Sequence, residues 1–408
     1  MQTFTGYEYL MIDAANQMGH DKWLFDDRIQ WVKDNMDSLE SLADQADKKP
    51  LYLKAVQAIR KAQAGQPTGH LVGFDAVCSG IQVMSALTGC KAGAEATGLI
   101  NPNVRADAYT ATTKIMNSIL GGVGVSVPRK KAKEALMTAY YGSKAKPVEI
   151  FGEDTPELTA FYAAATQVAP GAWELLQDLL KSWQPYALTH EWQLPDGYEA
   201  KVKVMEKVQT RIEVDELDHA SFTYEFKFNQ GSPKGLSNVA NVVHSVDAYI
   251  LRCIHRRCNY DLKVATEAYE WITEALSKPE FGDTADPMIT YYKDLYERSG
   301  VADVVILPYL NSSNVHNLTY PHLEELAKIV HSMLSHRPFE VVTVHDEFKC
   351  HANNMNHLRQ HYINIFCDLA NGCVLDMIFT DLFGKQVRYQ KLSEDLSEHI
   401  AQSNYALT

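Results

Sequence analysis

Residues 70–87 read HLVGFDAVCSGIQVMSAL. The run from His70 to Asp75 is short and mostly apolar, and the apolar residues after Ser79 recur at helical spacing. The pattern predicts a strand, a tight turn and a helix, with Asp75 at the end of the strand. A carboxylate at that position protrudes from a rigid edge, so Asp75 is a candidate site residue.

A second stretch of this kind, FEVVTVHDEFKCH, occupies residues 339–351. Val342, Val344 and Asp346 alternate along it, which predicts a strand, a turn and a second strand. Carboxylates from two strands so distant in the sequence, those of Asp75 and Asp346, could share two Mg²⁺ ions and clamp an in-line phosphoryl displacement. Each aspartate taken alone is more simply interpreted as the cap of a turn.

One basic helix is predicted over residues 126–142, which read SVPRKKAKEALMTAYYG. Ser126 is expected to cap this helix, Pro128 suits its first turn, and Gly142 suits its end. The pattern therefore gives the helix a defined start and a defined end.

The basic residues of this helix suggest an anion site. Arg129 and Lys133 are four residues apart, so they share one face near the positive end of the helix dipole. That arrangement suits a triphosphate, and Tyr141 would lie about two turns further on. The alternatives are a solvated basic face for the charges and core packing for the phenol ring.

Other sequence signals carry less weight. The glycines of residues 121–124 lack the Gly-Lys-Ser ending of a Walker loop, so a P-loop is rejected. Cys253, His255 and Cys258 have an unusual spacing for zinc and no matching pair. His244 alone is interpreted as a capping or hydrogen-bonded residue.

Composition describes a globular chain with an acidic balance. The chain has 408 residues, with 38 Lys plus Arg against 51 Asp plus Glu, and a net charge of −13. That balance alone argues against a protein that wraps nucleic acid. No apolar run of about 18 residues is present, and the N-terminus carries acids where a signal peptide needs bases. Seven cysteines, an odd number, suggest reduced thiols in a cytosolic compartment.

The rest of the chain alternates helical and strand patterns without a low-complexity linker. Residues 1–65 have helical periodicity, and so do the segments 243–253 and 324–334. Between Val202 and Phe228 the period is two, with alternate aromatic residues on one side, which predicts a β-hairpin. Because no linker divides the chain, any lobes are expected to be interwoven.

Taken in order, these segments resemble the phage-type single-subunit RNA polymerases, including the mitochondrial branch. GFDAVCSGIQVMSAL resembles motif A, Arg129-xxx-Lys133-xxxxxxx-Tyr141-Gly142-Ser143 resembles motif B, and Val344-His345-Asp346 resembles motif C. The flanks match too, in the upstream residues from Gly6 to Asn35, in the stretch to Asp107-Ala108-Tyr109, in VQTRIEV (208–214) and in NVVHSVDAY (241–249).

The resemblance implies roles for these residues. Asp75 and Asp346 would bind two Mg²⁺ ions, with the Ala76 carbonyl near one of them. Arg129 and Lys133 would hold the incoming triphosphate, and Lys133 would protonate the pyrophosphate leaving group. The remaining substrate-binding residues are Tyr109, Gly142, and the pair Tyr141 and His244, which would sense the ribose 2′-hydroxyl. Asp75, Asp346 and Lys133 are thus the expected catalytic residues.

The resemblance also implies a fold of the α/β (α+β) class. It is a helix-rich right-hand polymerase palm and fingers with a small antiparallel palm sheet. The expected parts are an N-terminal palm part with motif A (1–94), fingers with motif B and a hairpin (95–240), a helix returning to the palm (241–257), an inserted segment (258–325) and a C-terminal palm part with motif C (326–408).

Two other functions are compatible with parts of this pattern. Family A DNA polymerases have a similar motif B helix and a Val-His-Asp-Glu turn, but a Glu usually follows the motif A aspartate. Asp75 has no such acid close behind it, which favours ribonucleotides. A non-catalytic DNA-binding assembly subunit would not need to retain Asp75, Lys133, Tyr141 and Asp346.

Departures from the family pattern predict partners. The N-terminal domain and thumb have no counterpart, so the chain resembles the larger subunit of a split heterodimeric phage enzyme. The missing half would be a second chain, working in the cytoplasm of a bacterial host on NTPs, nascent RNA and a single-stranded or melted DNA template. Acids in the hairpin make independent promoter reading doubtful, which suggests an accessory recruitment protein and no membrane partner.

Overall fold

A computed structural model describes residues 1–278, 282 and 286–408. Its centre is a small antiparallel sheet of β1 (Leu71–Asp75), β7 (Glu347–His351) and β6 (Val342–Val344), in the order β1-β7-β6. Both predicted strand patterns are therefore confirmed, and they pair with each other across the sheet. Asp75 stands opposite Glu347, which places the end of β1 beside the turn between β6 and β7.

Helices cover this sheet because its strands bury alternate side chains. Val72, Phe74, Phe348 and Cys350 are buried in one hydrophobic core. The helices that contact one another around this core are α4 (Ser79–Thr88), α11 (Ser237–Cys258) and α15 (Met355–Asn371), with α16 (Val374–Phe383) and α17 (Leu396–Ile400) beyond them. The α11 helix contains the predicted segment 243–253 and is longer at both ends.

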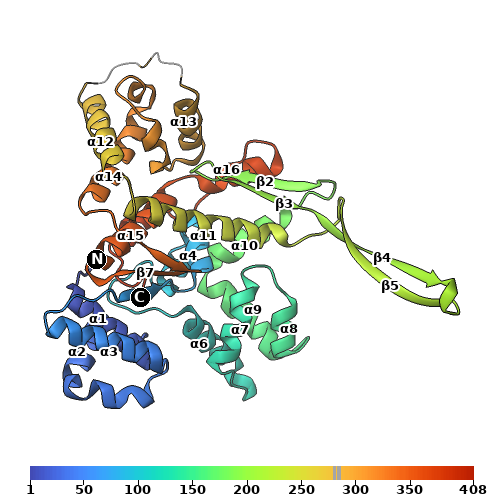
Figure 1. Cartoon of the computed structure of the whole chain (residues 1–408). Coiled ribbons are helices and arrows are strands. Elements are labelled where there is room, and N and C mark those ends of the chain that lie inside the picture. The colour runs from blue at the N-terminus through green and yellow to red at the C-terminus, as the bar shows by residue number, and fades with distance from the viewer. Residues whose placement is uncertain (279–281, 283–285) are drawn as a thin grey trace.

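The N-terminal region is helical, as its periodicity predicts. It contains α1 (Gly6–Ala15), α2 (Phe25–Asp34) and α3 (Lys49–Gln63), joined by the short helical turns Asn16–His20 and Met36–Gln45. A capping box in which Thr5 and Glu8 bond each other's backbone starts α1. These helices pack below the sheet in Figure 1.

A further group of helices lies to the right of the N-terminal helices in Figure 1. It consists of α5 (Lys91–Ala96), α6 (Ala108–Leu120), α7 (Arg129–Ala139), α8 (Ala145–Phe151), α9 (Pro156–Val168) and α10 (Pro170–Lys181). The strongest packing in this group joins α6 to α9 and α7 to α8.

The basic helix is shorter than predicted. It begins at Arg129 after Pro128, so Ser126 is not its cap, and it ends at Ala139. The physical reason is Asn117, whose side chain bonds both the N–H and the carbonyl of Val127 and holds the chain extended there. Gly142 follows in a turn at φ 90°, a conformation that favours glycine.

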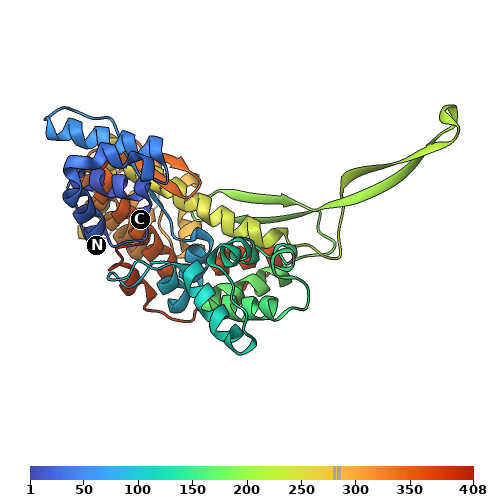
Figure 2. The same ribbon diagram turned by 90° about the horizontal axis from the view of Figure 1, so that it is seen from below.

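The predicted hairpin is really two structures joined at Val204. Residues up to Lys203 belong to β3 (Glu199–Lys203), which pairs with β2 (Thr189–Gln193), a pairing that the periodicity did not reveal. The long hairpin proper is β4 (Met205–Val214) and β5 (Ala220–Asn229), in register from Met205 opposite Asn229. It projects far from the rest of the molecule in both Figure 1 and Figure 2.

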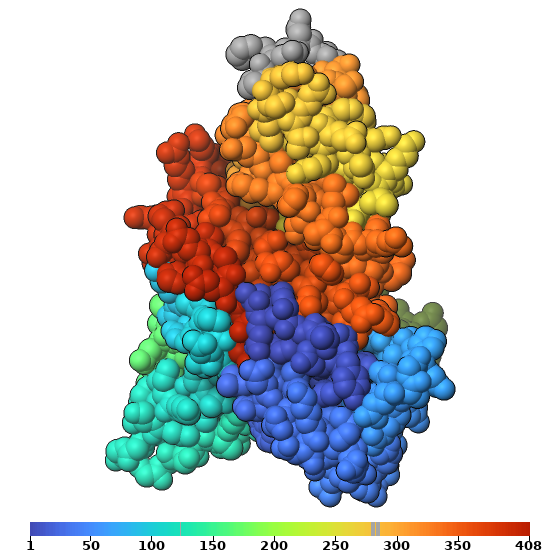
Figure 3. All heavy atoms as spheres, turned by 90° about the vertical axis from the view of Figure 1, so that its left-hand side faces the viewer, coloured from blue at the N-terminus to red at the C-terminus, as the bar shows by residue number. Residues whose placement is uncertain are grey.

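A second hydrophobic core lies in the region of the expected insertion. It packs α12 (Leu262–Ser277), α13 (Pro287–Ser299) and α14 (Tyr320–Leu334) around buried residues such as Ile272 and Leu326. These helices form a lobe at one end of the molecule (Figure 1, Figure 3). Within the expected insertion 258–325, residues 279–281 and 283–285 lie outside the described residues.

The structure is helix-rich with small antiparallel sheets, which agrees with the predicted α+β class. Within the described residues no single helix is long and apolar enough to cross a membrane; one bent pair, Ala352–Asn371 with Val374–Phe383, meets that test by length and composition only.

Candidate active site

Six of the expected site residues line one cavity of about 390 Å³. They come from four separate parts of the chain: the end of β1, the start of α6, the first turns of α7 and the β6–β7 turn. The residues are Asp75, Ala76, Tyr109, Arg129, Lys133 and Asp346. The fold therefore brings together the carboxylates and the cationic helix that the sequence pattern suggested.

The two aspartates are held by the backbone of the central sheet. Asp75 is the last residue of β1, and the N–H of Ala76 donates a 3.1 Å hydrogen bond to the carbonyl of Asp346. Asp346 lies in the turn after His345, a non-glycine residue at φ 56°. Such a conformation costs about 1 kcal/mol or more, so the surrounding sheet must hold this turn in place.

The environment of Asp75 favours a cation. Partial burial, and then the negative charges of Glu347 and Asp346, raise the pKa of the Asp75 carboxyl to about 6. Carboxylates crowded around one cavity repel each other until a cation or a proton neutralises them. Hard oxygen donors are also the ligands that Mg²⁺ prefers, so Asp75, Asp346 and the carbonyl of Ala76 fit that ion.

The cationic side of the cavity is organised by Asp107. This aspartate caps α6 and accepts hydrogen bonds from Nε and Nη2 of Arg129, at 2.9 and 2.6 Å. The guanidinium of Arg129 and the ammonium of Lys133 lie 5.5 and 5.4 Å from the centre of the Tyr109 ring. Lys133 has no ion-pair partner among the described residues, so its charge remains available to a ligand.

Tyr141 lies in an adjoining cavity of about 120 Å³, which Tyr109 and Asp346 also line. Its ring is 4.9 Å from the ring of His244 on α11. A Cβ atom on Gly80 would come within 2.5 Å of the Tyr141 hydroxyl oxygen, so the missing side chain of Gly80 makes room for that phenol. Burial raises the pKa of Tyr141, and its hydroxyl stays protonated at neutral pH.

Two expected substrate-binding residues do not line either cavity. His244 is exposed beside Tyr141, and Gly142 lies in the turn after α7, near Val239 of α11.

Sequence reasoning missed three carboxylates of this site. Asp107 positions Arg129, and the pattern of an aspartate ahead of the α6 helix was a detectable cap signal. Glu347 stands opposite Asp75. Asp247 on α11 lines neither cavity, but its pKa is raised to about 6 by burial and then by the charge of Asp346. The spacing of His244 and Asp247 alone predicted nothing of this kind.

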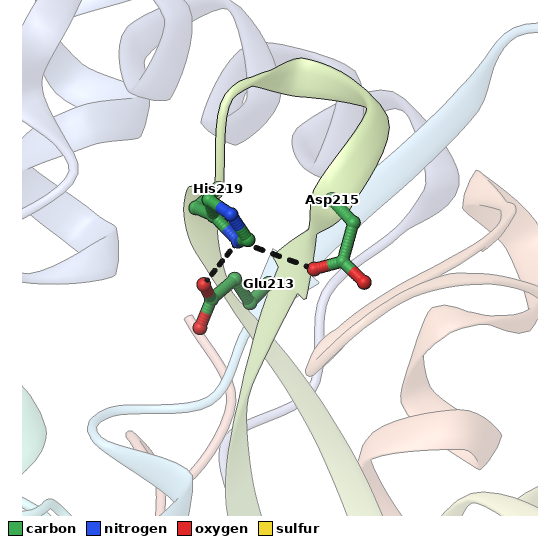
Figure 4. A group of neighbouring side chains, drawn as sticks. All are labelled: Glu213, Asp215 and His219. Atoms are coloured by element: carbon green, nitrogen blue, oxygen red, sulfur yellow. Dashed lines mark ion pairs between the residues drawn. The ribbon is translucent and has the colours of Figure 1, made fainter.

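Another group of possible metal ligands lies at the tip of the β4–β5 hairpin. Nδ1 of His219 is 2.9 Å from a Glu213 oxygen and 3.3 Å from an Asp215 oxygen (Figure 4). Within the described ranges this is the one set of three or more such residues whose ligand atoms already lie within 4.8 Å of one another. All three are exposed, and acidic groups on a surface often bind no ion.

Comparison with known proteins points to one class. Residues 2–149 match the family model described as DNA-dependent RNA polymerase. The matched stretch contains Asp75, Arg129, Lys133 and Tyr141, and Asp346 lies beyond it.

A curated relative agrees with that match. The chain is 25% identical, over 302 residues, to a DNA-directed RNA polymerase of Pseudomonas phage phiKMV. The alignment covers 60% of this chain and 37% of the relative, so the aligned part spans well under half the length of that enzyme.

Proposed function

We propose that this chain is the palm and fingers part of a DNA-directed RNA polymerase that adds ribonucleotides to a growing RNA. The observation that carries the proposal is the single cavity in which Asp75 and Asp346 face Lys133 and Arg129. Nucleotidyl transfer needs mainly positioning and charge stabilisation, and this cavity supplies both.

In this proposal the acidic residues bind the metal ions and the basic residues bind the triphosphate. Asp75, Asp346 and the carbonyl of Ala76 would hold two Mg²⁺ ions, which would supply charge neutralisation to the attacking and leaving oxygens. Lys133 would bind the triphosphate and give a proton to the departing pyrophosphate. Arg129 would bind the same triphosphate, and its ion pair with Asp107 fixes the direction of its guanidinium.

Sugar selection would fall to Tyr141. Its protonated hydroxyl can donate to or accept from a ribose 2′-hydroxyl, and His244 packs against its ring. A deoxynucleotide would leave the Tyr141 hydroxyl unpaired in a partly buried place, which costs binding energy. A family A-like DNA polymerase fragment would show the opposite preference.

The active enzyme would contain a second chain. What supports this is the share of the relative that aligns with the chain, which is 37%. A partner carrying the thumb and N-terminal elements would hold the primer–template, with single-stranded or melted DNA as the template and an accessory protein for recruitment.

A primer-extension assay tests the proposal. An RNA primer annealed to template DNA is offered with Mg²⁺ and either rNTPs or dNTPs, with and without the candidate partner chain. Extension with rNTPs that needs both chains is expected. Full activity without the partner contradicts the two-chain requirement, and no extension in either condition contradicts the polymerase assignment.

The Tyr141→Phe variant tests the sugar-sensing role in the same assay. Loss of one hydroxyl should reduce the preference for rNTPs over dNTPs by about 5-fold or more, because one hydrogen bond contributes about 1 kcal/mol or more. His244→Ala is the companion variant, expected to have a smaller effect. Unchanged selectivity in Tyr141→Phe rejects the role.

A further inference from the structure

Three histidines meet where the lobe of the second core joins the rest of the molecule. His336 follows α14, and His357 and His361 are one turn apart on α15. Nε2 of His336 lies 2.8 Å from Nε2 of His361, and the rings of His336 and His357 are 4.7 Å apart. None of the three is used by the proposed polymerase site.

The hydrogen bonds of His336 settle which of its nitrogens is free. Its Nδ1 lies 2.9 Å from the carbonyl oxygen of Arg337, and a carbonyl can only accept, so Nδ1 carries the hydrogen. Neutral His336 therefore presents the lone pair of Nε2 towards His361. A metal-binding histidine typically has this arrangement, with its other ring nitrogen bonded to a backbone carbonyl.

His361 is buried beside His336, and because Nε2 of His336 presents a lone pair, Nε2 of His361 is the donor of their 2.8 Å contact. His361 is 1% exposed, and its Nδ1 has no hydrogen-bond partner within the described part of the chain. Metal binding through Nε2 of His361 therefore requires its hydrogen to move to the unpaired Nδ1. The charge of the neighbouring Arg257 is balanced by an ion pair with Asp368 at 2.8 Å, so it does not prevent a cation from binding near His361.

We propose that His336, His357 and His361 form a binding site for a divalent transition metal, with Zn²⁺ as the preferred ion and water in the fourth position. Imidazole nitrogens suit zinc, and three protein ligands with one open position are a common zinc geometry. The His357-x-x-x-His361 spacing places two ligands on one helix face.

Small movements complete the coordination sphere. Tetrahedral zinc with bonds of about 2.0–2.1 Å separates two nitrogens by roughly 3.3 Å, so the 2.8 Å pair must open by about half an ångström. The ring of His357 must also turn, since the three sets of nitrogens do not yet lie within 4.8 Å of one another. His357 is only partly buried, which leaves its ring room to turn. Burial lowers the pKa of all three histidines, which keeps them in the neutral form that binds metal.

The position of the site indicates what the ion would do. Met333 belongs to the second core and Phe339 to the first, and His336 lies between them in the chain. The hydroxyl of Tyr260 is 2.8 and 2.5 Å from the carbonyl oxygens of Met333 and His336, which holds this junction in place. A metal bound here would fasten the lobe of α12, α13 and α14 to α15.

Metal titration of the full chain tests the site. After treatment with a chelator, the chain is titrated with Co²⁺, and then with Zn²⁺ against a chromophoric chelator, in buffer with millimolar Mg²⁺ to occupy the carboxylate cavity. The wild type should take up one Co²⁺ with visible ligand-field bands typical of tetrahedral nitrogen coordination. Zn²⁺ should displace the Co²⁺ and raise the melting temperature.

Variants locate the ion. His357→Ala changes a partly buried residue and should fold, yet bind at least about 10-fold more weakly and lose the thermal shift. His331→Ala, at an exposed histidine of α14, is the matched control and should bind as the wild type does. His219→Ala removes the hairpin-tip cluster and should also leave binding unchanged.

Three results would overturn the proposal. They are an absence of Co²⁺ uptake by the wild type, equal binding by His357→Ala and the wild type, and loss of binding in His219→Ala. Circular dichroism of each variant separates lost binding from lost folding, and His357→Asn repeats the test if His357→Ala does not fold. Because these measurements use no nucleotide, they stand apart from the polymerase assay.

Discussion

Two antiparallel hairpins of this molecule differ in how they are supported. In the short β6–β7 hairpin, strand β7 also pairs with β1, and its residues Phe348 and Cys350 are buried in the main core. We call it the supported hairpin. In the longer β4–β5 hairpin the two strands pair only with each other, and most of their residues are exposed on both faces. We call it the unsupported hairpin. An isolated two-stranded hairpin is marginal in water, so what supports a hairpin decides how accurately it can hold a side chain.

The contrast matches the chemistry of each hairpin. The supported hairpin holds Asp346, whose carboxylate must be placed to a fraction of an ångström if it is to share metal ions with Asp75. The unsupported hairpin displays Phe222, Tyr224 and Phe228, each about half exposed, and a row of acids at its tip. Its face is suited to contacts with another molecule.

The largest expected effect comes from a substitution in the β6–β7 hairpin. Asp346→Asn should reduce primer extension by at least about 1,000-fold, because it removes one of the two carboxylates that would hold the Mg²⁺ ions. The melting temperature should fall little or not at all, since the substitution also relieves repulsion with Asp75. Asp294→Asn, on the exposed side of α13, is the matched control and should retain activity. Substantial extension by Asp346→Asn would contradict the assignment of Asp346 as a ligand of the Mg²⁺ ions.

The next-largest expected effect is on the free energy of unfolding. It is measured by replacing one phenylalanine in each hairpin, Phe348 in β7 and Phe222 in β5. Phe348 is 3% exposed in β7, so Phe348→Ala should lower the free energy of unfolding by about 3–5 kcal/mol. Denaturant titration at constant buffer composition measures this loss. A loss below about 1 kcal/mol would mean that β7 is not supported by the core as described.

A subtler change addresses the packing behind Tyr141. Gly80→Ala adds a methyl group that would meet the Tyr141 hydroxyl at 2.5 Å, so the phenol must shift. Because alanine favours a helix over glycine, α4 should not be weakened. The expected result is a several-fold loss of rNTP over dNTP preference at nearly unchanged melting temperature. Equal selectivity in Gly80→Ala and the wild type would show that the exact place of Tyr141 is unimportant.

The smallest expected effect is on the unsupported hairpin. Phe222 is 53% exposed, so Phe222→Ala should change the free energy of unfolding by about 0.5 kcal/mol or less. Primer extension on a preformed primer–template should also remain near the wild-type rate. A loss comparable to that of Phe348→Ala would show that the hairpin face is packed against something in the folded chain.

Local periodicity in the sequence predicted many of the helices and strands. The short apolar run before Asp75 and the alternation before Asp346 predicted the strands. The repeat of apolar residues predicted α11 and α14, because these patterns reflect which side chains must be buried. The split at Val204 was not predictable, since the alternation continues through it and only pairing partners distinguish β3 from β4. The start of the basic helix at Arg129 likewise depends on Asn117, ten residues before Val127.

The sequence by itself determined the candidate residues of the polymerase-like site, because their types and order follow a recognisable motif pattern. Only the tertiary structure decided that Asp107 restrains Arg129, that the charge of Asp346 acts on Asp247, and that His336 faces His361. Each of these relations joins atoms from elements far apart in the chain. Spacing along a sequence reports contacts within one helix or strand, whereas charge pairing and metal coordination depend on distances that exist only after folding.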